Sequence, residues 1–363
     1  MSSTRFHFTG RAKTPFAREL RGAVESYFAT RGISPHANAA MVAKSLAMLG
    51  LLAVPYALVM SGAVSGLLAL LACALMGGAI AGIGFGIGHD ALHGAYATRP
   101  LWNRVLSFSF ELIGANRSFW QLTHNRAHHS FTNVDGADLD LRVADPLVRL
   151  SPHSPRLAHH RAQHLYAWPL YALTTLNWVF VKDYQYLFAP RFRSQLGSQL
   201  GRTEIALLFA GKALHYGWSL VLPLALLDLP LGQILLGYLV MHLVAGTLLS
   251  VVFQLAHVIE DLPVVTPDER GAIAEEWWAH QLRTTSNFAT RSRWLSWFTG
   301  GLNHQVEHHL FPRICSVHYP ALAPIVAATA RKHGLPYREH PTLGGAIASH
   351  YRRLKTLGTT NES

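Results

Sequence analysis

Residues 64–93 read VSGLLALLACALMGGAIAGIGFGIGHDALH, a nearly continuous apolar run that ends in two histidines. A second apolar stretch precedes it, so that the two candidate spans cover about residues 43–62 and 64–87. Each has the roughly 20 residues that a helix needs to cross the hydrocarbon core of a bilayer. We therefore predict two transmembrane helices joined by a tight turn.

A second pair of apolar stretches covers about residues 204–227 and 231–258, with Asp228-Leu229-Pro230 as the turn between them. Half of all residues are hydrophobic and only 14% are charged, whereas soluble domains carry about 25% charged residues. The sequence therefore predicts an all-α integral membrane protein with four transmembrane helices in two hairpins.

The basic residues predict the orientation of these spans. Six Lys or Arg precede residue 42, twelve lie between residues 88 and 203, and eleven follow residue 258, whereas the two turns carry none. Cytosolic loops are enriched in Lys and Arg, so we expect both termini and the central region to be cytosolic. In that region, residues 101–121 and 164–188 carry regular apolar and aromatic residues, which predict helices at the membrane interface or in a cytosolic helical cap.

We expect the chain to have three parts. They are a cytosolic N-terminal segment, residues 1–42, a membrane domain, residues 43–340, and a polar C-terminal tail, residues 341–363, which we expect to be mobile. The formal net charge is +11, but no nucleic-acid-binding motif accompanies it. The charge suits anionic lipid headgroups or an acidic protein partner better than nucleic acid.

Histidines gather in three clusters at predicted cytosolic positions. They are His89 and His93, then His124, His128 and His129, and finally His308 and His309. On an α-helix, residues four apart share one face, whereas His129 would be turned by about 100° from His128 and could reach another centre. Many imidazoles with few carboxylates favour a redox transition metal. The spacing therefore favours two metals bound at a membrane surface.

The text around the clusters is GHDALHGAY at 88–96, FWQLTHNRAHHSFTNVDGADLDL at 119–141 and GGLNHQVEHHLFPRICSVHYP at 300–320. These segments resemble the three histidine boxes of the membrane fatty-acid desaturase family, and the resemblance extends from about residue 40 to 340. It implies two iron ions, and it adds His257, at the end of the last span, as an eighth histidine ligand. Gln305 at the head of the third box resembles the front-end desaturases of the delta-5 and delta-6, linoleoyl-CoA desaturase-like type, as a possible ligand or determinant of regioselectivity.

The resemblance implies that dioxygen is a co-substrate and that a cis double bond is introduced into a fatty-acyl chain carried on a lipid, CoA or acyl carrier protein. Polar residues near the boxes could orient the imidazoles through their second N–H: Asp90, Asn125, Asp138, Asn303 and Glu307. Many front-end desaturases carry a fused cytochrome b5 domain with a His-Pro-Gly-Gly motif, which His340-Pro341-Thr342-Leu343 does not match. We therefore expect an external electron donor of the ferredoxin or cytochrome b5 type.

Other functions remain open at this point. A related di-iron lipid hydroxylase or acetylenase would use the same boxes. A protein that transports or stores metal would need polar residues along its spans, which offer little beyond His215, His242 and scattered Ser or Thr. His242 lies fifteen residues before His257, about 22 Å along a helix, so we expect it to pair with His215 rather than to reach the same metals.

Overall fold

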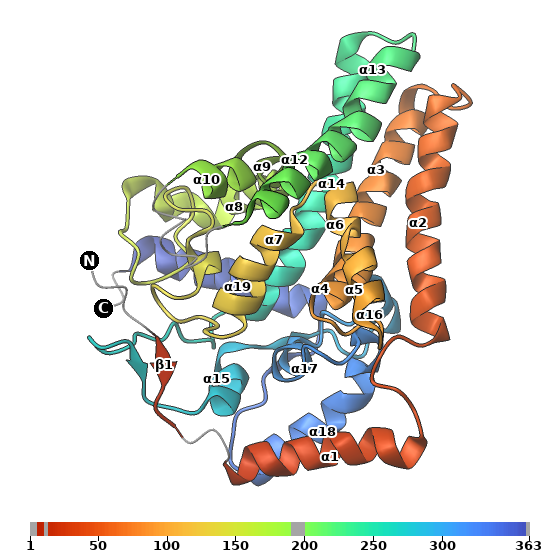
Figure 1. Ribbon diagram of the computed structural model, residues 1–363. Helices are drawn as coiled ribbons and strands as arrows, with labels where there is room; N and C mark the ends of the chain where they lie inside the picture. Colours follow the sequence, from red (N-terminus) through yellow and green to blue (C-terminus); the bar gives the residue numbers. More distant parts are fainter. Residues whose placement is uncertain (1–5, 11–13, 190–199, 361–363) are drawn as a thin grey trace. The chain divides into compact units, whose positions relative to one another are not determined.

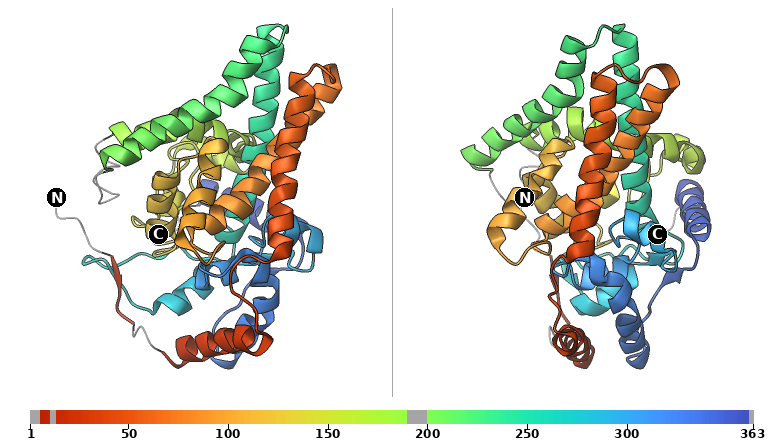
Figure 2. Two further views of the ribbon diagram at one scale, coloured as in Figure 1. Left: turned by 45° about the vertical axis from the view of Figure 1, so that its right-hand side comes forward. Right: turned by 90° about the vertical axis from the view of Figure 1, so that its right-hand side faces the viewer.

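The computed structural model of the protein describes residues 6–10, 14–189 and 200–360. Parts of the expected N-terminal segment, residues 1–5 and 11–13, and the last three residues of the expected tail lie outside this description. The described residues are mostly helical and form two compact units (Figures 1 and 2). The first unit comprises 1–38, 122–167 and 252–363, and the second comprises 39–121 and 168–251. Each unit is therefore assembled from segments that lie far apart in the sequence.

Four helical segments are long and apolar enough to cross a membrane: Ala39–Met60, Gly66–Leu92, Arg202–Leu226 and Leu231–His257. The prediction of an all-α fold with four candidate spans is confirmed. The largest difference from the predicted bounds is at the second span, which continues to Leu92 rather than ending at residue 87. The helix does not stop where the apolar run stops, and it carries the first histidine cluster at its end.

The spans are built from the following elements: α2 (Ala39–Met60); α3 (Gly66–Ile83), the π-helical turn η1 (Gly84–Gly88) and α4 (His89–Leu92); α12 (Arg202–Tyr216), η6 (Gly217–Val221) and α13 (Leu222–Leu226); and α14 (Leu231–His257). In the second unit α2 packs along α3, as Figure 2 shows from two sides. A Cβ atom at Gly77 would lie 2.3 Å from the carbonyl oxygen of Met241. Glycine at this position therefore permits the close approach of α3 to α14.

Shorter helices occupy the two regions where interfacial helices are expected: α5 (Pro100–Ser107), α6 (Ser109–Leu112), α7 (Arg117–Trp120), α8 (Gln163–Ala172), α9 (Thr174–Asn177), η5 (Trp178–Lys182) and α10 (Asp183–Phe188). On α5 the apolar side chains of Leu101, Trp102 and Val105 are exposed, whereas Asn103 and Ser107 are buried. A short helix that turns its apolar side chains outward suits the interface of a membrane.

The first unit packs around a core shared by α1 (Pro15–Arg31) and α18 (Tyr319–Lys332), which lie side by side in Figure 1. Its remaining elements are η2 (Gln121–His128), η3 (Leu139–Arg142), η4 (Ala158–Ala162), α15 (Trp277–Thr284), α16 (Arg293–Phe298), α17 (Gln305–Leu310), η7 (Ser316–His318) and α19 (Leu343–Thr359). Two parallel pairs of short strands join distant segments: β1 (His7–Phe8) with β2 (Ala272–Ile273), and β3 (Asn287–Phe288) with β4 (Glu339–His340).

The C-terminal segment differs from the mobile polar tail expected for residues 341–363. Residues 343–359 form α19, whose Ala346, Leu354 and Leu357 side chains are fully buried. The buried Arg149 guanidinium donates hydrogen bonds to the carbonyl oxygens of Leu357 and Thr360, at 2.5 and 3.0 Å. The polar overall composition concealed one apolar helical face, so the expectation of mobility is wrong for these residues.

Candidate metal centre

The second histidine cluster lies on a π-helix rather than on the α-helix that its spacing suggests. In η2 and just beyond it, the backbone N–H of His129 donates to the carbonyl oxygen of His124 at 2.9 Å, a bond that spans five residues. A π-turn aligns residues that are four and five apart more closely than an α-turn does. The ring centroid of His124 accordingly lies 5.1 Å from that of His128 and 4.7 Å from that of His129. All three rings of the cluster therefore lie together.

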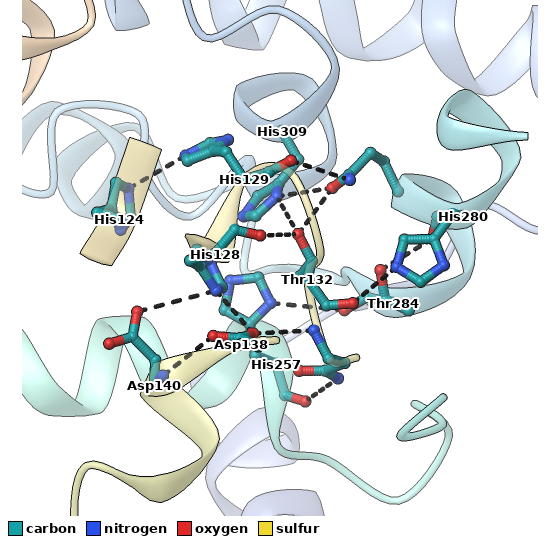
Figure 3. Close-up of polar contacts among 12 residues, drawn as sticks. His124, His128, His129, Thr132, Asp138, Asp140, His257, His280, Thr284 and His309 are labelled. Carbon is teal, nitrogen blue, oxygen red and sulfur yellow. Dashed lines mark hydrogen bonds and ion pairs between the residues drawn. The ribbon is translucent and has the colours of Figure 1, made fainter. Parts of the chain in front are cut away.

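Three histidines from separate elements of the first unit form a buried group. Ligand atoms of His128 on η2, His257 at the end of α14 and His309 on α17 lie within 4.8 Å of one another (Figure 3). Within the described part of the chain, the Nε2 atom of each is buried without a hydrogen-bond partner. Buried polar atoms normally have partners, so three converging imidazole nitrogens without them fit a bound transition metal.

The Nδ1 atoms of the same three imidazoles are occupied. Nδ1 of His128 lies 3.0 Å from Asp138, Nδ1 of His257 lies 3.5 Å from the carbonyl oxygen of Thr284, and Nδ1 of His309 lies 2.9 Å from the amide oxygen of Gln281. Metal-binding histidines usually donate their second N–H to such acceptors, which fixes the ring orientation. Both the three Nε2 atoms and the partners of the three Nδ1 atoms therefore match a metal site.

A second group adjoins the first. Ligand atoms of His129, His308 and His309 also lie within 4.8 Å of one another, so His309 is common to both groups. His124 is close to this second group, because its Nε2 atom lies 3.1 Å from Nε2 of His129. Two overlapping groups of imidazoles can hold two neighbouring metal ions, with His128 and His129 on different ions.

The carboxylate of Asp138 controls the protonation of His128 in the metal-free protein. Burial lowers the pKa of His128, but the charge of Asp138 and its hydrogen bond outweigh burial, so the pKa is raised overall. Burial raises the pKa of Asp138, but the contact with His128 and two backbone N–H bonds lower it overall. In contrast, burial and the neighbouring imidazoles hold the pKa of His309 well below its ordinary value. Asp138 thus favours the protonated form of His128, whereas the surroundings of His309 favour its neutral form.

The first histidine cluster belongs to the second unit. His89 and His93 lie at the end of the second candidate span, with ring centroids 4.7 Å apart. The indole of Trp120 lies 5.7 Å from His89 and 5.4 Å from His93, and Nδ1 of His89 lies 3.1 Å from a carboxylate oxygen of Asp90. The HxxxH spacing therefore brings both rings to one side of the helix end, as expected.

The other polar residues singled out in the sequence have varied partners. Gln305 donates to the carbonyl oxygen of Leu302 at 2.8 Å, and its side chain approaches His257. The amide of Asn303 donates to the carbonyl oxygens of Phe288 and Ala289. Asn303 therefore holds the loop before the third cluster, whereas Gln305 contacts both this loop and the imidazole of His257.

The contacts of Glu307 differ from the expected role of orienting an imidazole ligand. The Glu307 carboxylate accepts hydrogen bonds from Asn287 at 2.8 Å and Tyr337 at 2.9 Å. Burial raises the pKa of Glu307 to about 7. Asn125 is only half-buried on η2. Asp138 and Asp90 each contact the ring of a candidate ligand, His128 and His89 respectively.

Three residues near the histidines were not anticipated: Thr132, Asn133 and Gln281. Asn133 has a left-handed backbone conformation, φ 54°, which Asn adopts more readily than most residues. Its side chain donates to the carbonyl oxygen of His257 at 2.9 Å, and its backbone N–H donates to Asp138 at 2.9 Å. Thr132 and Asn133 lie within four residues of the second cluster, but the position of Gln281 depends on tertiary contacts that carry no sequence signal.

Two histidines within candidate spans lie next to each other in the second unit. The ring centroids of His215 and His242 are 5.3 Å apart, and Nδ1 of His242 lies 3.1 Å from the hydroxyl of Thr175. The expected pairing of these residues is confirmed. They are held by neighbours in their own unit, as internal polar contacts between helices commonly are.

Comparisons with known proteins agree with this site. Residues 65–341 match the family described as fatty acid desaturase. The chain is 37% identical over 359 residues to the sn-1 linoleoyl-lipid 6-desaturase of Synechocystis sp., covering 99% of both chains. It is 33% identical over 363 residues to the protein of the same name from Arthrospira platensis, covering 98% of that chain. It is also 37% identical to the acyl-lipid (8-3)-desaturase of Physcomitrium patens, over 93% of this chain and 70% of the relative.

Proposed function

This chain belongs to the fatty acid desaturase family, and we propose that it is a front-end enzyme that places a cis double bond between an existing one and the carboxyl end of a lipid-linked acyl chain. The relatives named as 6-desaturases cover nearly the whole chain and act on linoleoyl lipids by name. Gln305 at the head of the third box supports the same regioselectivity. The lipid carrier follows from the names of these relatives rather than from the boxes.

The observation that carries the proposal is the group of three buried Nε2 atoms of His128, His257 and His309, which have no partner among the described residues. We assign the metal ligands to all eight histidines of the boxes and the last span: His89, His93, His124, His128, His129, His257, His308 and His309. Gln305 is a further candidate. Two iron ions held there would supply the oxidising power that breaking an unactivated C–H bond requires, which no side-chain acid or base can supply.

The overall reaction balances with an external electron donor. The acyl chain loses two hydrogens, the donor supplies two electrons, solvent supplies two protons, and one dioxygen becomes two waters. A ferredoxin or a cytochrome b5 would fit as donor, because the net charge of +11 favours an acidic partner. We infer that both termini and the metal centre face the cytosol, since the basic residues avoid the two short turns between spans.

The protein's own residues orient the imidazole ligands and exclude bulk water from them. The carboxylate of Asp138 and the amide of Gln281 hold two of the imidazoles by their Nδ1 atoms. All three histidines of the first group are buried, which keeps bulk water from the nitrogens that face the metal. A lipid-linked substrate would already reside in the membrane that the apolar spans are suited to cross.

Two other functions are less well supported than desaturation. A hydroxylase or acetylenase would use the same boxes, but the relatives named above are all desaturases. A metal transporter would use polar groups along the spans, yet the histidines His215 and His242 contact each other and Thr175 instead. The product distinguishes the enzymes, because hydroxylation adds oxygen to the chain whereas desaturation removes hydrogen.

The proposal is tested by lipid analysis of host cells that lack such an activity and are supplied with a diunsaturated precursor. We expect wild type to produce a chain with one further double bond, His308→Ala to produce none, and the exposed-histidine control His159→Ala to match wild type. An unchanged acyl profile with wild-type protein present in the membrane, under both types of donor, would contradict the proposal.

A further inference from the structure

Gln281 is a fully buried residue on α15 that lies outside all three histidine clusters. Its amide nitrogen donates to the carbonyl oxygen of His129 at 3.2 Å, and its amide oxygen lies 2.9 Å from Nδ1 of His309. A single side chain therefore contacts one histidine of the second cluster and one of the third.

These two contacts determine which way the amide points. The carbonyl oxygen of His129 can only accept a hydrogen bond, so the amide nitrogen of Gln281 must face it. Exchanging the nitrogen and oxygen would set two acceptors against each other and lose the bond. The amide oxygen is therefore the atom that faces His309.

The amide oxygen in turn determines the tautomer of His309. Because this oxygen only accepts, Nδ1 of His309 must carry the hydrogen. The hydroxyl of Thr132 lies 3.1 Å from the same Nδ1, and it can donate its single hydrogen to the amide oxygen of Gln281, at 2.9 Å, or to the carbonyl oxygen of His128, at 2.8 Å (Figure 3 shows Thr132 beside His309). Nε2 of His309 is left as a lone pair, and it is buried without a partner within the described residues. A neutral imidazole binds a metal ion through such a lone pair.

We propose that Gln281 is a positioning residue of the metal centre, which holds His309 in its Nδ1–H tautomer and fixes this ring relative to His129. The inference rests on the proposed metal binding. Because His309 belongs to both groups of imidazoles, the loss of Gln281 affects both metal positions rather than one.

The test compares two buried glutamines in the same unit. Gln281→Met keeps the length of the side chain and removes both contacts. Gln163→Met is the matched control, since Gln163 is equally buried but bonds Arg149 and the carbonyl oxygen of Leu354. Each purified protein is loaded anaerobically with ferrous iron, and bound iron is measured under competition with a chelator, with Mössbauer spectra of the loaded samples.

We expect Gln281→Met to bind iron roughly 10- to 100-fold more weakly than wild type, as is typical when the partner of a ligand histidine is removed, and to show a changed Mössbauer spectrum. Gln163→Met keeps the wild-type iron affinity and spectrum. Gln281→Glu retains an acceptor for His309 but no donor for the carbonyl of His129, so its affinity lies between wild type and Gln281→Met.

A wild-type iron affinity in Gln281→Met overturns the inference, and so does an equal loss in Gln163→Met, which would point to general packing. If Gln281→Met does not fold, a wild-type affinity in Gln281→Glu overturns it. Absence of iron binding by the wild type itself would instead contradict the proposed function.

Discussion

Nδ1 of His128 lies 3.0 Å from a carboxylate oxygen of Asp138, and both side chains are buried. The carboxylate also accepts backbone N–H bonds from Asn133 and Asp140, at 2.9 and 3.0 Å. It is thus held in place independently of the imidazole. Since it occupies Nδ1, His128 can bind a metal only through Nε2, the atom that faces His257 and His309.

Replacing Asp138 should weaken metal binding. In Asp138→Asn the fixed acceptor for Nδ1 is weakened and the imidazole becomes a poorer ligand, so we expect iron affinity to fall about 10- to 100-fold. Chelator competition on purified protein measures this. Asp268→Asn is the control, because Asp268 likewise accepts two backbone N–H bonds, from Arg270 and Ala272, but not a bond from an imidazole ligand. Equal iron affinity in the two variants would contradict the assigned role.

Glu307 should make the stability of the protein depend on pH. Burial raises its pKa from 4.5 to about 7 in the folded protein, so the folded state holds the proton more tightly than the unfolded state. The resulting stabilisation is complete below pH 4.5 and is lost as pH rises to about 7, a change of about 3 kcal/mol at 1.36 kcal/mol per pKa unit.

Glu307→Gln removes this titration and preserves an acceptor for Asn287. We expect the variant to lose less stability than wild type between pH 5 and 7.5, measured as the thermal midpoint in detergent. The exposed Glu25→Gln serves as control and should follow wild type. Parallel pH curves for wild type and Glu307→Gln would show that the buried carboxyl is not the titrating group.

The C-terminal helix should be required for a stable first unit. Arg149 bonds the carbonyl oxygens of Leu357, Thr360 and Ser154, and Nδ1 of His350 on α19 donates to the carbonyl oxygen of Val258, next to His257, at 2.6 Å. Arg149→Met removes the donor to the carbonyl oxygens of Leu357, Thr360 and Ser154. An unsatisfied buried acceptor costs about 1–3 kcal/mol, so the thermal midpoint of the variant should fall by several degrees. Arg161→Met, at an exposed position nearby, should not change it; a wild-type midpoint for Arg149→Met would refute the role.

The sequence predicted those features that depend on composition and local spacing. The four spans were within five residues of their observed bounds, because long apolar runs have few alternatives in a membrane. The clusters containing His89, His128 and His309 were recognised from their HxxxH and HH patterns. Candidate metal ligands that are close together in a short sequence motif can be identified without knowledge of the tertiary structure.

Other features depend on contacts between distant segments. The π-helical form of the second cluster is not encoded in an HxxxH spacing, which fits α- and π-turns alike. Gln281 is a glutamine within no motif, and its role follows only from its distances to His129 and His309. The sequence did not predict helix α19, because its buried apolar face is short and is interrupted by polar residues.

Front-end desaturation by this protein is tested most directly by mass analysis of the acyl product formed by purified, iron-loaded protein in lipid vesicles, with dioxygen and a reduced ferredoxin or cytochrome b5. The vesicles contain a lipid with a linoleoyl chain. We predict a product that has lost two hydrogens and gained a double bond on the carboxyl side of the existing pair. An oxygen-containing product, or a new double bond on the methyl side, would contradict the assignment as a front-end desaturase.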